Sequence, residues 1–237
     1  MIYATGDLHG DITRFREKDI KRLRKNDYLI ICGDFGFLWD GSDREKKLLR
    51  WIGKRRYSVL FVEGVHDNLY LLSKYPEEEW NGGRTRVISG RLRQLCRGSV
   101  FNIDGRRIFA FGGGETPSAE MIDISVGWQE EMLPAKNDLE TARRNLASCD
   151  CSVDYIVTHQ CSRKMKKLLT MEENEANILD TFFDEIREQC RYNTWVFGSY
   201  HIDRVIPPSE IALFERVVPL GSPIPFANTK TGTARAK

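Results

Sequence analysis

Residues 2–11 read IYATGDLHGD, a short apolar run that turns at once into a loop of aspartate, histidine and glycine. The same change occurs over residues 27–36, DYLIICGDFG, and again over residues 57–68, YSVLFVEGVHDN. Such apolar runs, bounded by polar loops, predict buried strands. Three strand–loop–helix units in close succession indicate a largely parallel sheet. Polar groups just beyond the carboxyl ends of these strands lie at the edge where open α/β sheets bind ligands.

The segments between these strands have the apolar spacing of helices. The first predicted helix has an apolar face made of Ile12, Phe15, Ile20 and Leu23. A second helix is predicted to begin at Ser42 or Asp43, either of which can cap it, and to run to about Lys54. A third, short helix covers the leucines of residues 69–72.

Beyond residue 84 the pattern changes. Short apolar segments separated by glycine-containing turns predict an antiparallel meander over residues 84–89, 92–97, 100–103 and 107–112. Residues 113–135 look irregular, and within them Glu115 to Trp128 form either a lid over a cleft or a purely structural insert. In the remainder, helices are expected over 136–147, 162–169 and 175–189, and strands over 152–158, 194–198, 203–206 and 210–216.

The predicted organisation is one α/β domain over residues 1–221, followed by a flexible tail over residues 222–237. The content of 41% hydrophobic and 30% charged residues is typical of a soluble globular protein. A formal net charge of +2 does not by itself indicate a nucleic-acid partner. We interpret the basic clusters at residues 21–25 and 54–56, and the acidic run Glu77–Glu79, as solvated helix ends.

Cysteine usage and hydropathy suggest where the protein resides. No signal peptide precedes the first strand, and no apolar run approaches the ~18 residues that span a bilayer. We therefore expect a cytoplasmic protein with no membrane partner. The six cysteines include no CxxC pair, which favours reduced thiols over disulfides. Cys149 and Cys151 leave a soft-metal site open as a weaker alternative.

Each of the four histidines follows a predicted strand directly; they are His9, His66, His159 and His201. The same loops carry Asp7, Asp34 and Asp67. A single histidine in such a loop is more often a hydrogen-bonded structural residue. Four histidines placed alike, together with the aspartates, favour a shared metal site. Imidazole and carboxylate ligands suit Mn, Fe and Zn.

The loops also resemble five ordered motifs of the calcineurin-like metallophosphoesterases. These are DxH at Asp7-Leu8-His9, GD at Gly33-Asp34, GNH(D/E) at Gly64-Val65-His66-Asp67, the isolated histidine at Thr158-His159, and GHxH at Gly198-Ser199-Tyr200-His201. The resemblance extends from residue 2 to about residue 216 and is closest to small single-domain bacterial and phage members. It implies an α/β fold, a four-layer α/β/β/α sandwich of two mixed sheets flanked by helices.

The resemblance implies two metal sites. Asp7, His9 and His201 would bind the first metal, and Asp34 would bridge the two. The second metal would take His159, together with the asparagine of GNH and the first histidine of GHxH. Two such metals activate a hydroxide and neutralise charge on the transferring phosphoryl group.

The resemblance also implies a catalytic pair. His66 would protonate the leaving oxygen or steady the phosphate, and Asp67 would orient it. The expected substrate is a phosphorylated small molecule or a nucleotide, although nucleic acids and phosphoproteins are also used on this scaffold. The sequence selects neither the substrate nor the oligomeric state.

Two ligands of the second metal are replaced. Val65 stands where the family has asparagine, and Ser199 stands where it has the first histidine. Valine offers no donor atom, and a neutral hydroxyl is a poor substitute for imidazole. Asn68 is near in sequence, but it could substitute only if the loop rearranged. We expect one tightly bound divalent transition metal and a second that is weak or absent.

These replacements leave three interpretations open. The protein is a metallophosphoesterase of reduced activity, a silent scaffold or binding protein that keeps one metal, or a single-metal protein with another chemistry. A serine hydrolase is not supported, because no Gly-x-Ser-x-Gly motif occurs. Cys161 is the weak candidate for a thiol nucleophile. Gly112–Gly114 lack the lysine of a P-loop, and Tyr200 belongs either to the rim of the site or to packing.

Overall fold

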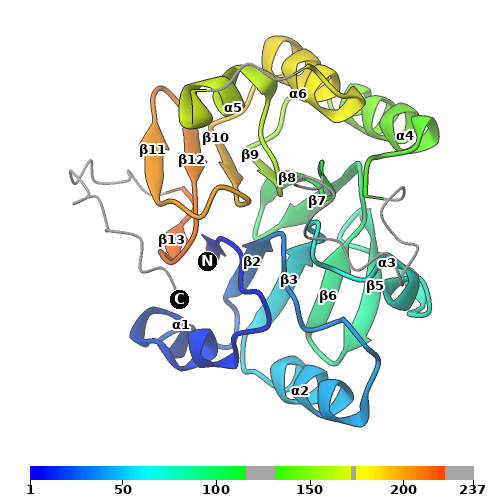
Figure 1. Ribbon diagram of the computed structural model, residues 1–237, viewed down its shortest axis with the longest axis vertical. Helices are drawn as coiled ribbons and strands as arrows, with labels where there is room; N and C mark the ends of the chain where they lie inside the picture. The colour runs from blue at the N-terminus through cyan, green and yellow to red at the C-terminus, as the bar shows by residue number, and fades with distance from the viewer. Residues whose placement is uncertain (116–131, 172–174, 222–237) are drawn as a thin grey trace.

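The computed structural model describes residues 1–115, 132–171 and 175–221 (Figure 1). The possible lid ending at Trp128 lies, beyond Glu115, outside the described residues, as does the predicted tail over 222–237. The described residues form two mixed β-sheets with helices on their outer faces. This arrangement is the predicted α/β/β/α sandwich.

The first sheet has seven strands in the order β13-β1-β2-β3-β6-β5-β4. Their bounds are β1 Ile2–Thr5, β2 Tyr28–Cys32, β3 Ser58–Val62, β4 Glu77–Trp80, β5 Gly83–Ser89, β6 Leu92–Leu95 and β13 Val218–Pro219. The neighbours β1, β2, β3 and β6 run parallel, whereas β5, β4 and β13 pair antiparallel. Strands β1, β2 and β3 are buried almost throughout, as their apolar sequences require.

The second sheet has six strands in the order β11-β12-β10-β9-β8-β7. Their bounds are β7 Ser99–Ile103, β8 Arg106–Phe111, β9 Tyr155–Thr158, β10 Thr194–Phe197, β11 Arg204–Ile206 and β12 Glu210–Ala212. Strands β8, β9, β10 and β12 are parallel, and the two outer strands pair antiparallel. Both sheets therefore have a parallel centre whose carboxyl ends carry the histidine-bearing loops.

The helices divide between the two outer faces, as Figure 1 shows. The 3-10 helix η1 (Ile12–Arg16), α1 (Lys18–Lys21) and α2 (Asp43–Gly53) contribute to the core on the outer face of the first sheet, and α3 (Leu69–Leu72) also packs there. The helices α4 (Lys136–Ala147), α5 (Arg163–Thr170) and α6 (Ile178–Gln189) cover the second sheet. A third core lies between the sheets. Neighbouring residues of β2 alternate between these cores, because Ile30 faces the inter-sheet core and Ile31 faces the helices.

The first predicted helix is wrong as a single element. Its residues form η1 and α1, which are separated by Glu17 in an extended conformation (φ −64°, ψ 149°). The guanidinium of the buried Arg14 donates to the Thr5 hydroxyl at 3.0 Å and to the Glu215 carbonyl at 2.9 Å. These tertiary bonds anchor the first segment, and the apolar residues still reach the core. The second helix matches its prediction, with Ser42 as the N-cap.

The predicted antiparallel meander is wrong at its middle. Strand β6 pairs parallel with β3 and antiparallel with β5, and the chain then crosses to the other sheet to form β7 and β8. The two leucines of β6 explain this placement, because Leu92 faces the helix-side core and Leu95 faces the inter-sheet core. Strand β6 thus lies inside the first sheet, between β3 and β5. Gly98, at φ +72°, makes the crossing where it packs against Ala142.

The acidic run is not a helix end. Glu77–Glu79 lie in the edge strand β4, antiparallel to β5. Glu77 pairs with Arg84 and Arg86, and Glu78 pairs with Arg93. Charged side chains at an exposed edge strand oppose pairing with another chain. The short β13 beside β1 was also not predicted. Among the helices of the described residues, none is long and apolar enough to span a membrane.

Candidate metal centre

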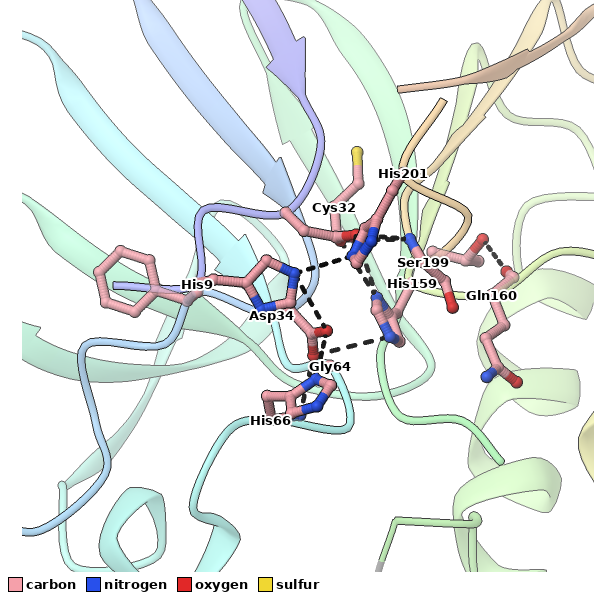
Figure 2. Close-up of polar contacts among 12 residues, drawn as sticks. His9, Cys32, Asp34, Gly64, His66, His159, Gln160, Ser199 and His201 are labelled. Carbon is pink, nitrogen blue, oxygen red and sulfur yellow. Dashed lines mark hydrogen bonds and ion pairs between the residues drawn. The ribbon is translucent and has the colours of Figure 1, made fainter. Parts of the chain in front are cut away.

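Five loops converge at the carboxyl ends of the parallel strands. Asp7 and His9 follow β1, Asp34 follows β2, and His66 follows β3; His159 and His201 follow β9 and β10 of the second sheet. Figure 2 shows the side chains of His9, Asp34, His159 and His201 turned toward one another. The sequence motifs therefore meet in space, although residues 9 and 201 lie at opposite ends of the chain.

The first group of potential ligands contains Asp7, His9 and His201, with one ligand atom of each within 4.8 Å of the others. The Nε2 atoms of His9 and His201 are 2.9 Å apart. Nε2 of His201 is 3.4 Å from Oδ2 of Asp7, and Nε2 of His9 is 3.9 Å from Oδ2 of Asp34. Burial lowers the pKa of His9, which favours the neutral imidazole that a metal requires.

The second group contains Asp7, Asp34 and His159, all of them buried. The ring nitrogens of His159 lie 3.6 Å from Oδ1 of Asp7 and 3.7 Å from Oδ1 of Asp34. Nε2 of His159 is buried and has no hydrogen-bond partner among the described residues. An orphaned buried nitrogen facing a carboxylate costs free energy unless something ligates it. These residues therefore fit a bound cation.

The charges of this buried group depend on one another. Burial disfavours charge on His159, but the Asp34 and Asp7 carboxylates outweigh it and raise the pKa of His159 to about 9. Burial likewise favours neutral Asp34, but His159 and His66 hold the pKa of Asp34 far below its usual range. A carboxylate that stays ionised while buried is the type of ligand that a divalent cation binds.

His66 lies beside Asp34, at the open side of the centre. Its Nδ1 is 2.7 Å from Oδ2 of Asp34, and its backbone N–H donates to Oδ1 at 2.8 Å. The bond to Asp34 raises the pKa of His66, and partial burial opposes the rise. The side chain remains 42% exposed, so a bound substrate can reach the ring. His9, Asp34 and His66 also form a third group of potential ligands.

Asp67 is fully buried and ties two of the loops together. Its carboxylate accepts from the backbone N–H groups of Phe35 at 3.1 Å, Gly36 at 2.8 Å and Gly64 at 2.9 Å. Burial raises the pKa of Asp67 to about 7, and Asp34 adds to the rise, whereas the three N–H groups lower it. The carboxylate thus holds the loop after β2 against the loop that carries His66.

Asp67→Ala is expected to lower the free energy of unfolding by about 2–4 kcal/mol, because three buried N–H groups lose their acceptor. Urea denaturation followed by circular dichroism measures the change. Asp67→Asn is the matched control, since it keeps one acceptor oxygen and the side-chain shape, and it should lose less. Equal midpoints for Asp67→Ala and the wild type would show that the carboxylate does not hold these loops.

Neither replaced position supplies an imidazole, thiol or carboxylate. Val65 is buried and apolar. Ser199 contributes its backbone instead, because its N–H donates to both oxygens of Asp7, at 3.2 and 2.9 Å. Asn68 is already engaged. Its Oδ1 accepts from Leu71 N–H at 3.0 Å, and its Nδ2 donates to the Trp39 carbonyl at 2.9 Å.

The backbone of the centre is strained. His9, Asp34, Ser199 and His201 have φ values of 46°, 40°, 69° and 49°. Non-glycine residues rarely adopt this left-handed region, at a cost of about 1–3 kcal/mol each, and such residues cluster at functional sites. Gly33 has φ +99°, and a Cβ there would stand 2.0 Å from Nδ1 of His159. The close packing of backbone on ligands thus requires this glycine.

Two further sequence candidates, Cys161 and Tyr200, pack against each other beside the second sheet. Cys161 is buried, and burial raises the pKa of its thiol to about 12, which disfavours the thiolate of a nucleophile. Its thiol donates to the Tyr200 hydroxyl at 3.4 Å, and the Tyr200 ring packs edge-on against Phe197. Gln160, which the sequence did not single out, accepts from the Glu115 N–H and donates to the Glu115 carbonyl, both at 3.0 Å. These two bonds fix the backbone of Glu115.

Two packed mixed sheets with an aspartate–histidine cluster at their strand ends define an α/β protein with a candidate metal centre. Comparison with protein-family models is more specific, because the model of the calcineurin-like phosphoesterases matches residues 1–211. The chain belongs to the calcineurin-like phosphoesterase family, whose members are metal-dependent phosphoester hydrolases. A search of curated proteins found no relative that matches the chain.

Proposed function

We propose that this protein hydrolyses phosphoesters with one tightly held divalent metal and a second, weakly held one. The observation that carries the proposal is the meeting of Asp7, His9 and His201 within ligand distance of one another, beside the orphaned ring nitrogen of His159. Carboxylate and imidazole together suit Mn, Fe and Zn, and Mn²⁺ is the first metal to test.

The first metal would be held by Asp7, His9 and His201, with Asp34 as the ligand that it shares with the second. The second would keep only Asp34 and His159. When bound, the metals supply an activated hydroxide and positive charge near the phosphoryl group. The chain itself supplies orientation, because the Ser199 N–H donates to the Asp7 carboxylate and fixes its position.

His66 is the proposed proton donor to the leaving oxygen. Nδ1 is engaged with Asp34, whereas Nε2 makes no hydrogen bond with the described residues. A partly exposed imidazole anchored through one nitrogen can present the other to a substrate. Asp67 holds the loop that carries His66, and its negative charge contributes to the raised pKa of His66. The proposed substrate is a phosphorylated small molecule or a phosphodiester.

The test is turnover of bis-p-nitrophenyl phosphate and p-nitrophenyl phosphate with added Mn²⁺. We expect measurable rates well below those of a complete two-metal enzyme. Losing the charge of one metal removes roughly several kcal/mol of transition-state stabilisation. Elemental analysis after gel filtration should give about one metal per chain. Two tightly bound metals, or a rate equal to that of a complete two-metal enzyme, would contradict the weakened second site.

A silent scaffold that keeps one metal is the second candidate. The observation in its favour is the loss of two donors on the same metal, at Val65 and Ser199. The two candidates differ in one measurement. A metal-loaded protein with no turnover of either substrate across several added metals would favour the scaffold.

A further inference from the structure

A groove of about 490 Å³ lies between η1 and α2, outside the metal centre. Its lining combines cations with apolar surface, and consists of Ile12, Arg16, Arg44, Lys47, Leu48 and Trp51. The apolar members are only partly buried against the helix-side core. No acidic residue lines the groove.

The cations of the groove are uncompensated. Arg16, Arg44 and Lys47 are exposed, and none forms a salt bridge with an acidic side chain of the described residues. The acids nearby in sequence are engaged elsewhere, since Glu17 pairs with Arg14 and Asp43 pairs with Lys46. The groove therefore has a local positive charge that the nearly neutral net charge of the chain conceals.

The groove side of α2 also presents an aromatic ring. Residues 44, 47, 48 and 51 recur at helical spacing and so share one face. The Trp51 ring packs edge-on against Phe15, with centroids 6.0 Å apart, and the Arg55 guanidinium lies 3.7 Å from its centroid. Cations placed around an aromatic ring form the surface on which proteins stack bases and bind phosphates.

The groove begins close to the metal centre. Ile12 follows the ligand His9 by three residues, so their Cα atoms are at most about 11 Å apart. Between these two residues the Asp11 N–H donates to the Leu8 carbonyl at 2.9 Å. This bond turns the chain and brings Ile12 nearer to His9. A strand of a few nucleotides can therefore occupy the groove and present a phosphodiester to the centre.

A larger cavity of about 560 Å³, beside α3 and β5, carries this inference less well. It also contains arginines, but Arg84 and Arg86 both pair with Glu77, which lines the same cavity. Its positive charge is thus already neutralised. An anionic ligand would gain more from the unpaired cations between η1 and α2.

We propose that this groove binds single-stranded nucleic acid and delivers it to the metal centre. The proposal rests on the proposed phosphoester hydrolysis for its role, but the binding itself requires only the groove. Phosphates would meet Arg16, Arg44 and Lys47, and bases would lie on the apolar surface of Trp51 and Leu48. An acidic peptide would use the cations alone and would leave the apolar surface of the groove unused.

Binding is measured by fluorescence anisotropy of a labelled oligothymidylate about 12 nucleotides long, with EDTA present so that hydrolysis does not interfere. We expect Arg44→Ala/Lys47→Ala to weaken binding about 10- to 100-fold at low salt. The slope of log affinity against log salt should become shallower by about 1.4, because each lost contact to a single strand removes about 0.7. The matched control is Lys46→Ala/Arg50→Ala, which removes two exposed cations from another face of α2 and should bind as the wild type does.

Equal weakening by both double variants, or by neither, overturns the proposal. Competition by polyglutamate as strong as that by unlabelled oligothymidylate also overturns it, in favour of an acidic peptide. Turnover of bis-p-nitrophenyl phosphate is measured separately. Groove-dependent binding without turnover supports this inference while the proposed hydrolysis fails, and turnover without binding overturns only this inference.

Discussion

Asp7→Asn is expected to abolish tight metal binding and to lower phosphoester turnover about 1,000-fold or more. Asp7 belongs to both of the main ligand groups, since it faces His201 in one and His159 in the other. Replacing its charge by an amide removes a ligand of the first metal and the charge that orients His159. Bound metal is measured by elemental analysis, and turnover with bis-p-nitrophenyl phosphate and Mn²⁺.

The matched comparison is His66→Asn, which changes a residue proposed to act on the leaving oxygen. Its metal content should equal that of the wild type, while turnover falls about 100- to 10,000-fold, the range of general acid catalysis. Circular dichroism confirms that both variants are folded. Full metal content in Asp7→Asn would show that the first site is not where we propose it.

The second large effect is a gain. Val65→Asn combined with Ser199→His should raise bound metal toward two per chain and raise turnover about 100-fold. The double substitution restores both missing donors of the second metal, which joins Asp34 and His159. One added charge near a transferring phosphoryl group is worth several kcal/mol in a low-dielectric site, so a rise of this size is within its reach.

The backbone is suited to this change. Ser199 already has φ +69°, a conformation in which histidine is enriched among non-glycine residues, and its N–H bond to Asp7 does not depend on the side chain. The control is Val65→Ala/Ser199→Ala, which alters the same positions without adding a donor. A double variant with unchanged metal content would show that these positions do not control the second site.

The sequence predicted those parts of the fold that depend on local pattern. The apolar runs at 2–6, 27–32 and 57–62 form β1, β2 and β3, because consecutive apolar residues predict a strand that is buried on both faces. The broken first helix was not predictable in this way. It depends on Arg14, which bonds to residues about 200 positions away. The position of β6 likewise depends on which core each of its leucines faces.

The candidate ligands could be predicted because each strand ends in its own short motif. The structure brings these side chains together, and their binding of metal stays a prediction. The contacts of Asp67 could not be predicted, since its partners are backbone N–H groups of two loops. Neither could the left-handed backbone at Asp34 and His201, because aspartate and histidine adopt this conformation more often than other side chains but still only rarely, so residue type does not single out a position.

The pairing of His9 with His201 has a consequence for how the protein is made. A ribosome releases the first ligands early, yet the partner imidazole follows only after β10, most of the chain later. A growing polypeptide therefore cannot assemble the first site, however well its amino-terminal strands have formed. Assembly of the proposed metal site must therefore wait until β10 and His201 have been synthesised, so a cation bound there would join two halves of the chain made at different times.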